Sequence, residues 1–295
     1  MTIEEFLIKK QAPEKNSLRK SKRMFSRKPD KKFSIETKKI VAAMEDNFLQ
    51  KTTYFASCLP QYMEVLKINS VTLSNAKIPS DTFNIAIGGK LEKKNAEETI
   101  FAIAKHFDKL PMAWWFGPHS NYEPYQEILQ KAGFSHKEHD IGMSMKLNTL
   151  PNNFEYSKDL KIQTVKNQKS LNDYAAVLTS IFSPPDRHIA DYYSLVAKLN
   201  LNLERPMKLF LAYLEGQAVA ISACYFSQQV TGVYDVCTLP KMQKRGFGSA
   251  MTYHALQTAK KSGYELAVLQ ASPEGINIYK RFGFTETCSF NVYGK

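Results

Sequence analysis

Residues 234–250 carry the groups best suited to hold a phosphate-bearing ligand. An apolar run ends in a short basic loop that contains Gly246 and Gly248, and a helical pattern follows the loop. The backbone N–H groups of such a loop, together with the N-terminus of the helix behind it, form an anion-binding site. We expect the two glycines to permit close backbone approach and a positive φ, while Lys244 and Arg245 add positive charge.

Two better-known glycine loops are excluded by the spacing. A Walker loop would end in Gly-Lys followed by Ser or Thr, and no such run occurs here. A dinucleotide fingerprint would need a third glycine three residues after Gly248, where this chain has Met251. The spacing that is present is Gln243-x-x-Gly246-x-Gly248.

A second ordered pattern follows the loop. Residues 251–260 predict a helix, and residues 265–270 predict a buried strand. A turn and a short helix carrying Tyr279 come next, and that helix ends at Gly283-Phe284.

These two motifs, at this separation, resemble the GNAT superfamily of acyl-CoA-dependent N-acyltransferases over about residues 160–290. The family often has Asn seven residues before its tyrosine, where this chain has Ser272, which keeps a hydrogen-bonding group. The resemblance implies an α/β fold with a mixed, splayed β-sheet flanked by helices. It also implies acetyl-CoA, or another acyl-CoA, as the co-substrate, and no metal.

The resemblance implies where the co-substrate would bind. The pantetheine arm would lie between two splayed strands, against the backbone of residues 236–238 and 269–271, and the pyrophosphate against the N–H groups of residues 244–250. A backbone N–H near residues 236–238 would stabilise the oxyanion. Holding both reactants together can supply ~7–11 kcal/mol, so no covalent intermediate is required. The expected cofactor-binding residues are Val236, Cys237, Thr238, Gln243, Lys244, Arg245, Gly246, Phe247, Gly248, Ser249, Ala250 and Ser272.

Two residues are candidates for proton transfer. The resemblance makes Tyr279 the candidate general acid toward the departing thiolate, whereas the alternative is an aromatic ring that fills the gap between helix and sheet. Asp235 is a carboxylate in an otherwise apolar run, so it is the candidate base, or it holds a backbone amide or an arginine. Asp186, His188 and Asp191, or a relay of water, remain alternatives for the base.

The composition is typical of a soluble enzyme. At 295 residues and 43% hydrophobic content, the chain has room for two ordinary domains, and no apolar run approaches the ~20 residues of a membrane span. The first residues contain early acids and no long apolar region, which argues against a cleaved secretory signal. Four scattered cysteines, Cys58, Cys224, Cys237 and Cys288, predict reduced core residues of a cytoplasmic protein without a metal site.

The positive charge is concentrated at the N-terminus. Residues 1–39 hold 13 Lys and Arg against 5 Asp and Glu, within a chain whose net charge is +12. We expect residues 1–35 to form a mobile basic tail or a loosely docked helix. Its role is either to keep the protein soluble or to contact an acidic partner, a nucleic acid or an anionic membrane.

The first half repeats the plan of the second in reduced form. It predicts strands at 71–76, 83–87 and 112–116, and helices at 95–107 and 123–131. A Gly-Phe pair at 133–134 follows, and then a strand that ends near residue 147. This half resembles the reduced N-terminal module of tandem GNAT proteins. The loop at 88–95 lacks the glycine spacing, so this half is expected to complete a core or a wall of the acceptor site rather than to bind acyl-CoA.

The sequence therefore predicts an α/β protein of two GNAT-like modules, at 36–150 and 157–295, behind a basic tail at 1–35. The C-terminal module is predicted to transfer an acyl group, most simply acetyl, from coenzyme A to a primary amine. A small amine, an amino acid, a peptide N-terminus and a protein lysine are all compatible acceptors, and the oligomeric state is open. Two other classes are an acyl-CoA-binding adaptor whose turnover is lost or incidental, and a nucleic-acid or membrane binder that works through its tail.

Overall fold

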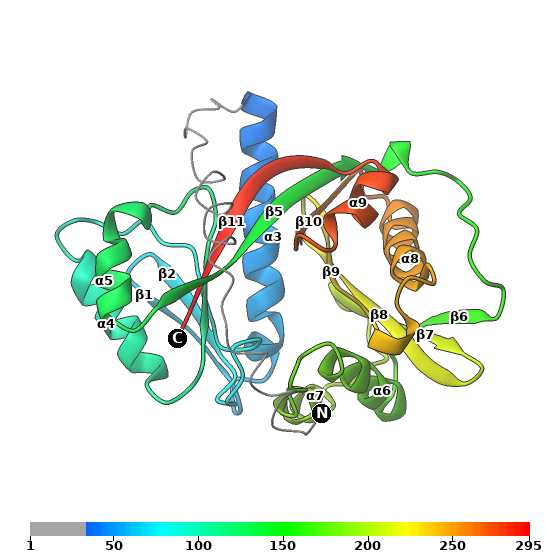
Figure 1. Cartoon of the computed structure of the whole chain (residues 1–295), viewed down its shortest axis with the longest axis horizontal. Helices are drawn as coiled ribbons and strands as arrows, with labels where there is room; N and C mark the ends of the chain where they lie inside the picture. The colour runs from blue at the N-terminus through cyan, green and yellow to red at the C-terminus, as the bar shows by residue number, and fades with distance from the viewer. Residues whose placement is uncertain (1–33) are drawn as a thin grey trace, which may run out of the picture. The chain divides into compact units, whose positions relative to one another are not determined.

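The computed structural model of the chain describes residues 34–295 (Figure 1). Residues Thr37–Lys295 form one compact unit. The predicted basic tail lies almost entirely outside the described residues. Within residues 34–295, no helix is both long enough and apolar enough to cross a membrane.

The first half of the described chain begins with a long helix and ends with a long strand. Its elements are α3 (Ile35–Cys58), β1 (Glu64–Ile68), β2 (Val71–Asn75), β3 (Ile85–Ile87), α4 (Ala96–Phe107), β4 (Ala113–Phe116), the 3₁₀ turn η1 (Glu123–Tyr125), α5 (Gln126–Lys131), β5 (Ser135–Lys146) and η2 (Leu147–Thr149). The strands and helices predicted between residues 71 and 147 are therefore present, with small shifts at their ends. Helix α3 was not among the predicted elements.

The second half contains the elements around the glycine loop. They are β6 (Leu160–Thr164), α6 (Gln168–Thr179), α7 (His188–Val196), β7 (Met207–Leu214), β8 (Gln217–Phe226), β9 (Thr231–Thr238), η3 (Pro240–Met242), α8 (Phe247–Lys261), β10 (Leu266–Ala271), α9 (Ile276–Phe282) and β11 (Thr285–Gly294).

The strands of residues 34–295 form one 11-stranded sheet in the order β1-β2-β3-β4-β11-β5-β10-β9-β8-β7-β6. The last strand of each half is exchanged. Strand β5, from the first half, pairs with β10, whereas β11, from the second half, lies between β4 and β5. Figure 1 shows β5 and β11 side by side. Each half therefore completes the sheet of the other, and the division into 36–150 and 157–295 stays a prediction.

Helices cover both faces of the C-terminal strands. Alternate residues of a strand point to opposite faces, so Leu209 and Leu211 of β7 pack with helices α3, α6 and α7, while Phe210 and Ala212 pack with α8 and α9. We call these two sides the α3 face and the α8 face. Helix α4 covers the strands of the first half, where Trp114 is fully buried.

A buried asparagine fastens α3 to the C-terminal strands. The side-chain amide of Asn47 donates to the carbonyl oxygens of Tyr225 and Val230, each at 3.1 Å, and to the Ser227 hydroxyl at 2.9 Å. Its carbonyl oxygen accepts from the Tyr234 hydroxyl at 2.7 Å. Helix α3 is thus held on the α3 face by polar contacts as well as by apolar packing.

We expect Asn47→Ala to lower the free energy of unfolding by about 3 kcal/mol, because it leaves several buried polar groups without partners. Urea unfolding followed by circular dichroism measures the change. Gln50→Ala on the same helix is the control, since the Gln50 amide donates only to exposed Asp46. An unfolding midpoint equal to that of the wild type would show that these bonds do not hold α3 in place.

Candidate active site

Strands β9 and β10 separate over most of their length. They pair in parallel only at Ala267–Thr231 and Val268–Gly232. Beyond these pairs, residues 233–238 and 269–271 have no partners across the gap, although each strand keeps its other neighbour. The splayed sheet that the sequence predicts is confirmed, and its open backbone edges suit an extended, amide-containing group.

The glycine loop ends where the gap opens. Gly246 has φ +83° and is the N-cap of α8. Lys244 also has a positive φ, of 61°. Residues Gln243 to Gly246 are exposed, so the loop faces solvent in front of the helix.

Helix α8 begins at Phe247, four residues before the predicted start at 251. The expectation of a positive φ at Gly248 is wrong, because this residue lies inside the first turn of the helix. A Cβ at Gly248 would lie 3.5 Å from Ile278 Cδ1 and 3.7 Å from Thr238 Oγ1. Because Gly248 has no side chain, a narrow space stays open between the end of β9 and helix α9.

The first turn of α8 presents unpaired backbone donors. The N–H groups of Phe247, Gly248 and Ser249 donate to no backbone carbonyl within residues 34–295, whereas the N–H of Ala250 donates to the Gly246 carbonyl at 3.0 Å. Free N–H groups at a helix N-terminus favour anions. The Phe247 and Ala250 side chains are buried, so these predicted residues offer a ligand only their backbone.

Positive side chains surround this helix start. The Arg245 guanidinium lies 5.2 Å from the centre of the Phe247 ring. Arg281 of α9 donates to the Ser249 hydroxyl at 3.3 Å, a contact that the sequence analysis missed. Ser272, at the end of β10, is exposed, and its carbonyl accepts from the N–H of Gly275 at 3.0 Å.

Tyr279 lies on α9 and is 9% exposed. Its hydroxyl makes no hydrogen bond within the described chain, and its ring meets Phe284 edge to face at 5.9 Å. Burial raises the pKa of Tyr279 far above its usual value, helped by the nearby Cys237 and the carboxylates of Asp140 and Asp235. The phenol is therefore protonated at neutral pH and has its donor free.

Asp235 sits at an irregularity of β9. The register with β8 shifts between Ile221 and Ala223, and Asp235 has φ 52°. Its carboxylate accepts from the Tyr174 hydroxyl at 3.0 Å and lies 3.6 Å from the Lys51 ammonium of α3. The predicted alternative partners were a backbone amide or an arginine, and the observed partners are a tyrosine and a lysine.

Cys237 and Val236 occupy the edge of the gap beside Asp235. Burial raises the pKa of the Cys237 thiol to about 12, so the thiol is protonated and a weak nucleophile. Cys237 packs toward the α3 face and Val236 toward the α8 face.

The other candidate bases form a local network at the start of α7. One oxygen of Asp186 accepts from the Ser80 hydroxyl at 2.6 Å and the other from the His188 N–H at 2.9 Å. His188 Nδ1 lies 3.1 Å from the Asp191 carboxylate. The hydrogen bond between Asp186 and Ser80 joins the segment before α7 to the first half of the chain. Asp186, His188 and Asp191 each therefore have a partner within the protein.

Two small cavities lie near the α3 face. One, of about 70 Å³, is lined by residues that include Lys51, Phe83, Tyr192 and Asp235, so it draws on both halves of the chain. Phe83 and Tyr192 stack there with ring centres 3.7 Å apart.

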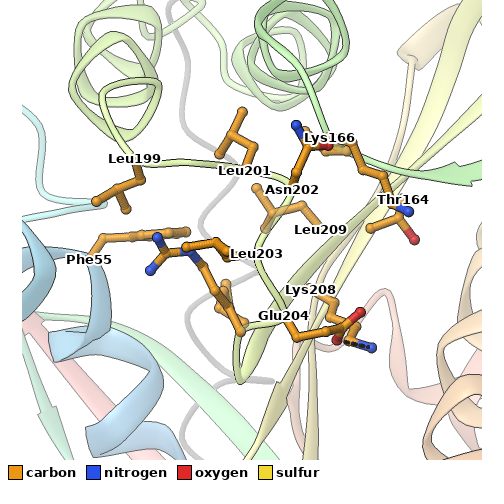
Figure 2. Close-up of a pocket in the computed structure, with 13 residues that line it drawn as sticks. Phe55, Thr164, Lys166, Leu199, Leu201, Asn202, Leu203, Glu204, Lys208 and Leu209 are labelled. Atoms are coloured by element: carbon orange, nitrogen blue, oxygen red, sulfur yellow. Dashed lines mark ion pairs between the residues drawn. The ribbon is translucent and has the colours of Figure 1, made fainter.

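The other cavity, of about 110 Å³, lies beneath the segment that leads into β7 (Figure 2). Leucine side chains and Phe55 line it, and the Lys208–Glu204 ion pair, at 3.0 Å, stands at its rim. None of the predicted site residues belongs to it.

The comparisons with known proteins agree with this geometry. Residues 172–284 match the model of the acetyltransferase (GNAT) family. No curated protein matches the chain.

Solved structures share the fold at low sequence identity. A GCN5-related N-acetyltransferase from Kribbella flavida aligns with a TM-score of 0.64 and 17% identity, over 87% of this chain and 95% of that one. A functionally unknown conserved protein from Staphylococcus epidermidis aligns with a TM-score of 0.60 and 16% identity, over 78% and 92% of the two chains. A tandem GNAT protein from the clavulanic acid biosynthesis pathway aligns with a TM-score of 0.51 and 8% identity, over 76% and 78%. Residues 172–284 are therefore similar to the acetyltransferase (GNAT) family, and the chain has the mixed, splayed α/β fold of GNAT proteins.

Proposed function

We propose that this protein transfers an acetyl group from acetyl-CoA to a primary amine, by direct attack in a ternary complex. The observation that carries the proposal is the splay between β9 and β10, which opens directly onto the free N–H groups of the first turn of α8. An extended amide-containing arm fits the first feature, and a pyrophosphate fits the second.

The residues present fit the co-substrate. A Cβ at Gly246 would meet no atom within 4 Å, so the space in front of the helix is open to a ligand. Lys244, Arg245 and Arg281 place positive charge around that space. Acetyl-CoA would supply an activated thioester there, and residues 236–238 would offer a backbone N–H to its oxyanion.

Tyr279 is the proposed general acid. Its free, protonated hydroxyl lies near Cys237 on β9, where it can give a proton to a departing thiolate. Asp235 stays a predicted base. Its contacts with Lys51 and Tyr174 also suit it to hold those side chains around the smaller cavity.

Calorimetric titration with acetyl-CoA, followed by an acetylation assay on a panel of primary amines, tests the proposal. Saturable binding with turnover supports an acetyltransferase. Binding without turnover on any amine would favour an acyl-CoA-binding adaptor. Absence of binding would refute the proposed function.

Deleting residues 1–33 is expected to leave the affinity for acetyl-CoA unchanged, because every proposed cofactor contact lies between residues 236 and 281. The same calorimetric titration, run on the truncated and full chains, checks this. A tenfold loss of affinity would assign the tail to the cofactor site. Any role of the tail toward an acidic partner, and the cytoplasmic location, stay predictions.

A further inference from the structure

The exchange of strands brings an unpaired buried acid to the end of the splay. Asp140 of β5 is 7% exposed and makes no hydrogen bond or ion pair within residues 34–295. Its neighbour Ile141 pairs with Ala271, the last residue of β10, so Asp140 lies just beyond the end of that strand. The carboxylate oxygens of Asp140 are not among the fully enclosed, unpartnered side-chain atoms of the described residues, so a group that enters the gap can reach them.

Asp140 faces the side of the sheet opposite to Tyr279. It pairs with Phe290 of β11, which packs against Met44 of α3. Paired residues of neighbouring strands point to the same face, so Asp140 is on the α3 face. Tyr279 packs with the core of the α8 face. The charge of Asp140 nevertheless contributes to the raised pKa of the Tyr279 hydroxyl. The two groups therefore approach the gap from opposite sides.

A second unsatisfied group lies beside Asp140. Gln270 pairs with Gly142, two residues along β5 from Asp140, and so shares its face. The Gln270 side-chain nitrogen is buried and has no hydrogen-bond partner. Asp235, across the gap on β9, already forms an ion pair with Lys51 and accepts a hydrogen bond from Tyr174. Within residues 34–295, Asp140 and Gln270 thus place unused hydrogen-bonding groups on the α3 face next to the end of the splay.

Acidic side chains surround Asp140 at the surface. Glu138 on its own strand and Glu274 in the turn before α9 raise the pKa of Asp140, whereas His139 of β5 lowers it. Asp81, from the turn before β3, acts with Glu274 on Glu138. Burial, reinforced by Glu138, raises the pKa of Asp140 to about 6. In a chain with a net charge of +12, this local negative rim would attract a cation.

We propose that Asp140 accepts the proton of the incoming amine, and that the acceptor is a cationic primary amine that enters as an ammonium ion past Asp81, Glu138 and Glu274. This inference rests on the proposed acetyltransferase function. The site is made from both halves of the chain, because β5 supplies Asp140 and α9 supplies Tyr279.

The proposed step balances. Asp140 takes one proton from the ammonium ion and later releases it to solvent. The neutral nitrogen attacks the thioester carbonyl carbon and forms the C–N bond. The C–S bond then breaks, and the thiolate receives a proton from Tyr279. The second proton leaving the nitrogen replaces the one that Tyr279 gave.

The test is acetyl transfer from acetyl-CoA to three five-carbon amines that differ at the far end: 1,5-diaminopentane, 5-aminopentan-1-ol and 5-aminopentanoate. We expect kcat/KM to fall at least tenfold from the diamine to the amino acid. For Asp140→Asn we expect a loss of about 100-fold in kcat/KM for the diamine at pH 7. The decline of the wild-type rate below about pH 6 should disappear in the variant, because that decline reports protonation of Asp140.

Asp159→Asn, at an exposed acid, is the matched control and should keep the wild-type rate and pH profile. Folding of Asp140→Asn is checked by its thermal midpoint. In the wild type the folded pKa of about 6 lies above the unfolded value of about 3.9, so ionised Asp140 destabilises the fold above pH 6 and not below about pH 4. The variant should therefore have a higher midpoint than the wild type at pH 8 and the same midpoint at pH 3.5.

The outcomes separate the two proposals. A wild-type rate and pH profile in Asp140→Asn would overturn the role of Asp140 and leave the acetyltransferase in place. Equal or better use of 5-aminopentanoate, or no acetylation of any of the three amines by a protein that binds acetyl-CoA, would overturn the cationic acceptor. Failure of the wild type to bind acetyl-CoA would remove the proposed function and this inference with it.

Discussion

Gly246→Val is expected to abolish the binding of acetyl-CoA. Gly246 caps α8 with φ +83°, a conformation that a β-branched residue adopts only under strain. A Cβ at this position would project into open space in front of the unpaired N–H groups of residues 247–249. The valine methyl groups would therefore occupy the space that a pyrophosphate needs. A loss of at least 100-fold in affinity corresponds to about 3 kcal/mol.

A control must separate this steric block from backbone strain. Gly263, at the opposite end of α8, has φ +85°, and a Cβ there would also meet nothing within 4 Å. Gly263→Val therefore carries a similar conformational cost without approaching the loop. Calorimetric titration of both variants should show no binding for Gly246→Val and wild-type affinity for Gly263→Val. Equal affinity in the two variants would remove the pyrophosphate from this loop.

Tyr279→Phe is expected to lower kcat by about 100-fold while the affinity for acetyl-CoA stays within twofold of the wild type. The hydroxyl makes no hydrogen bond within residues 34–295, so its removal leaves no protein group without a partner. The ring keeps its contact with Phe284, and the fold should remain intact. A selective fall in kcat would then report loss of proton donation to the thiolate.

The exposed Tyr156 provides the control for this substitution. Steady-state kinetics of Tyr279→Phe and Tyr156→Phe, with calorimetry for acetyl-CoA, separates turnover from binding. If kcat of Tyr279→Phe equals that of the wild type, the tyrosine is a packing residue of α9 and the thiolate takes its proton from solvent.

The side of the site that would hold the co-substrate was predictable from local sequence. A strand, the spacing Gln243-x-x-Gly246-x-Gly248, a helix, a second strand and Tyr279 before Gly283 follow one another within 60 residues. Glycine conformation, helix capping and hydrophobic alternation act between near neighbours in the chain, so the pattern indicates the arrangement without tertiary information. The error at Gly248 has the same local origin, because two glycines in one loop do not reveal which of them takes the positive φ.

The proposed acceptor side required the three-dimensional structure. Lys51 approaches Asp235 from α3, and Asn47 of the same helix fixes α3 to the C-terminal strands. Asp140 reaches the end of β10 because β5 and β11 are exchanged between the halves.

The physical reason is sequence separation. The partners on the acceptor side lie more than 100 residues apart in the chain. Spacing along one strand cannot specify which distant strand will pair with it. Burial and charge at such positions are set by the partner element. The residues of the loop indicated a phosphate site by their types and order, whereas the proposed proton acceptor, Asp140, emerged from the packing of the two halves.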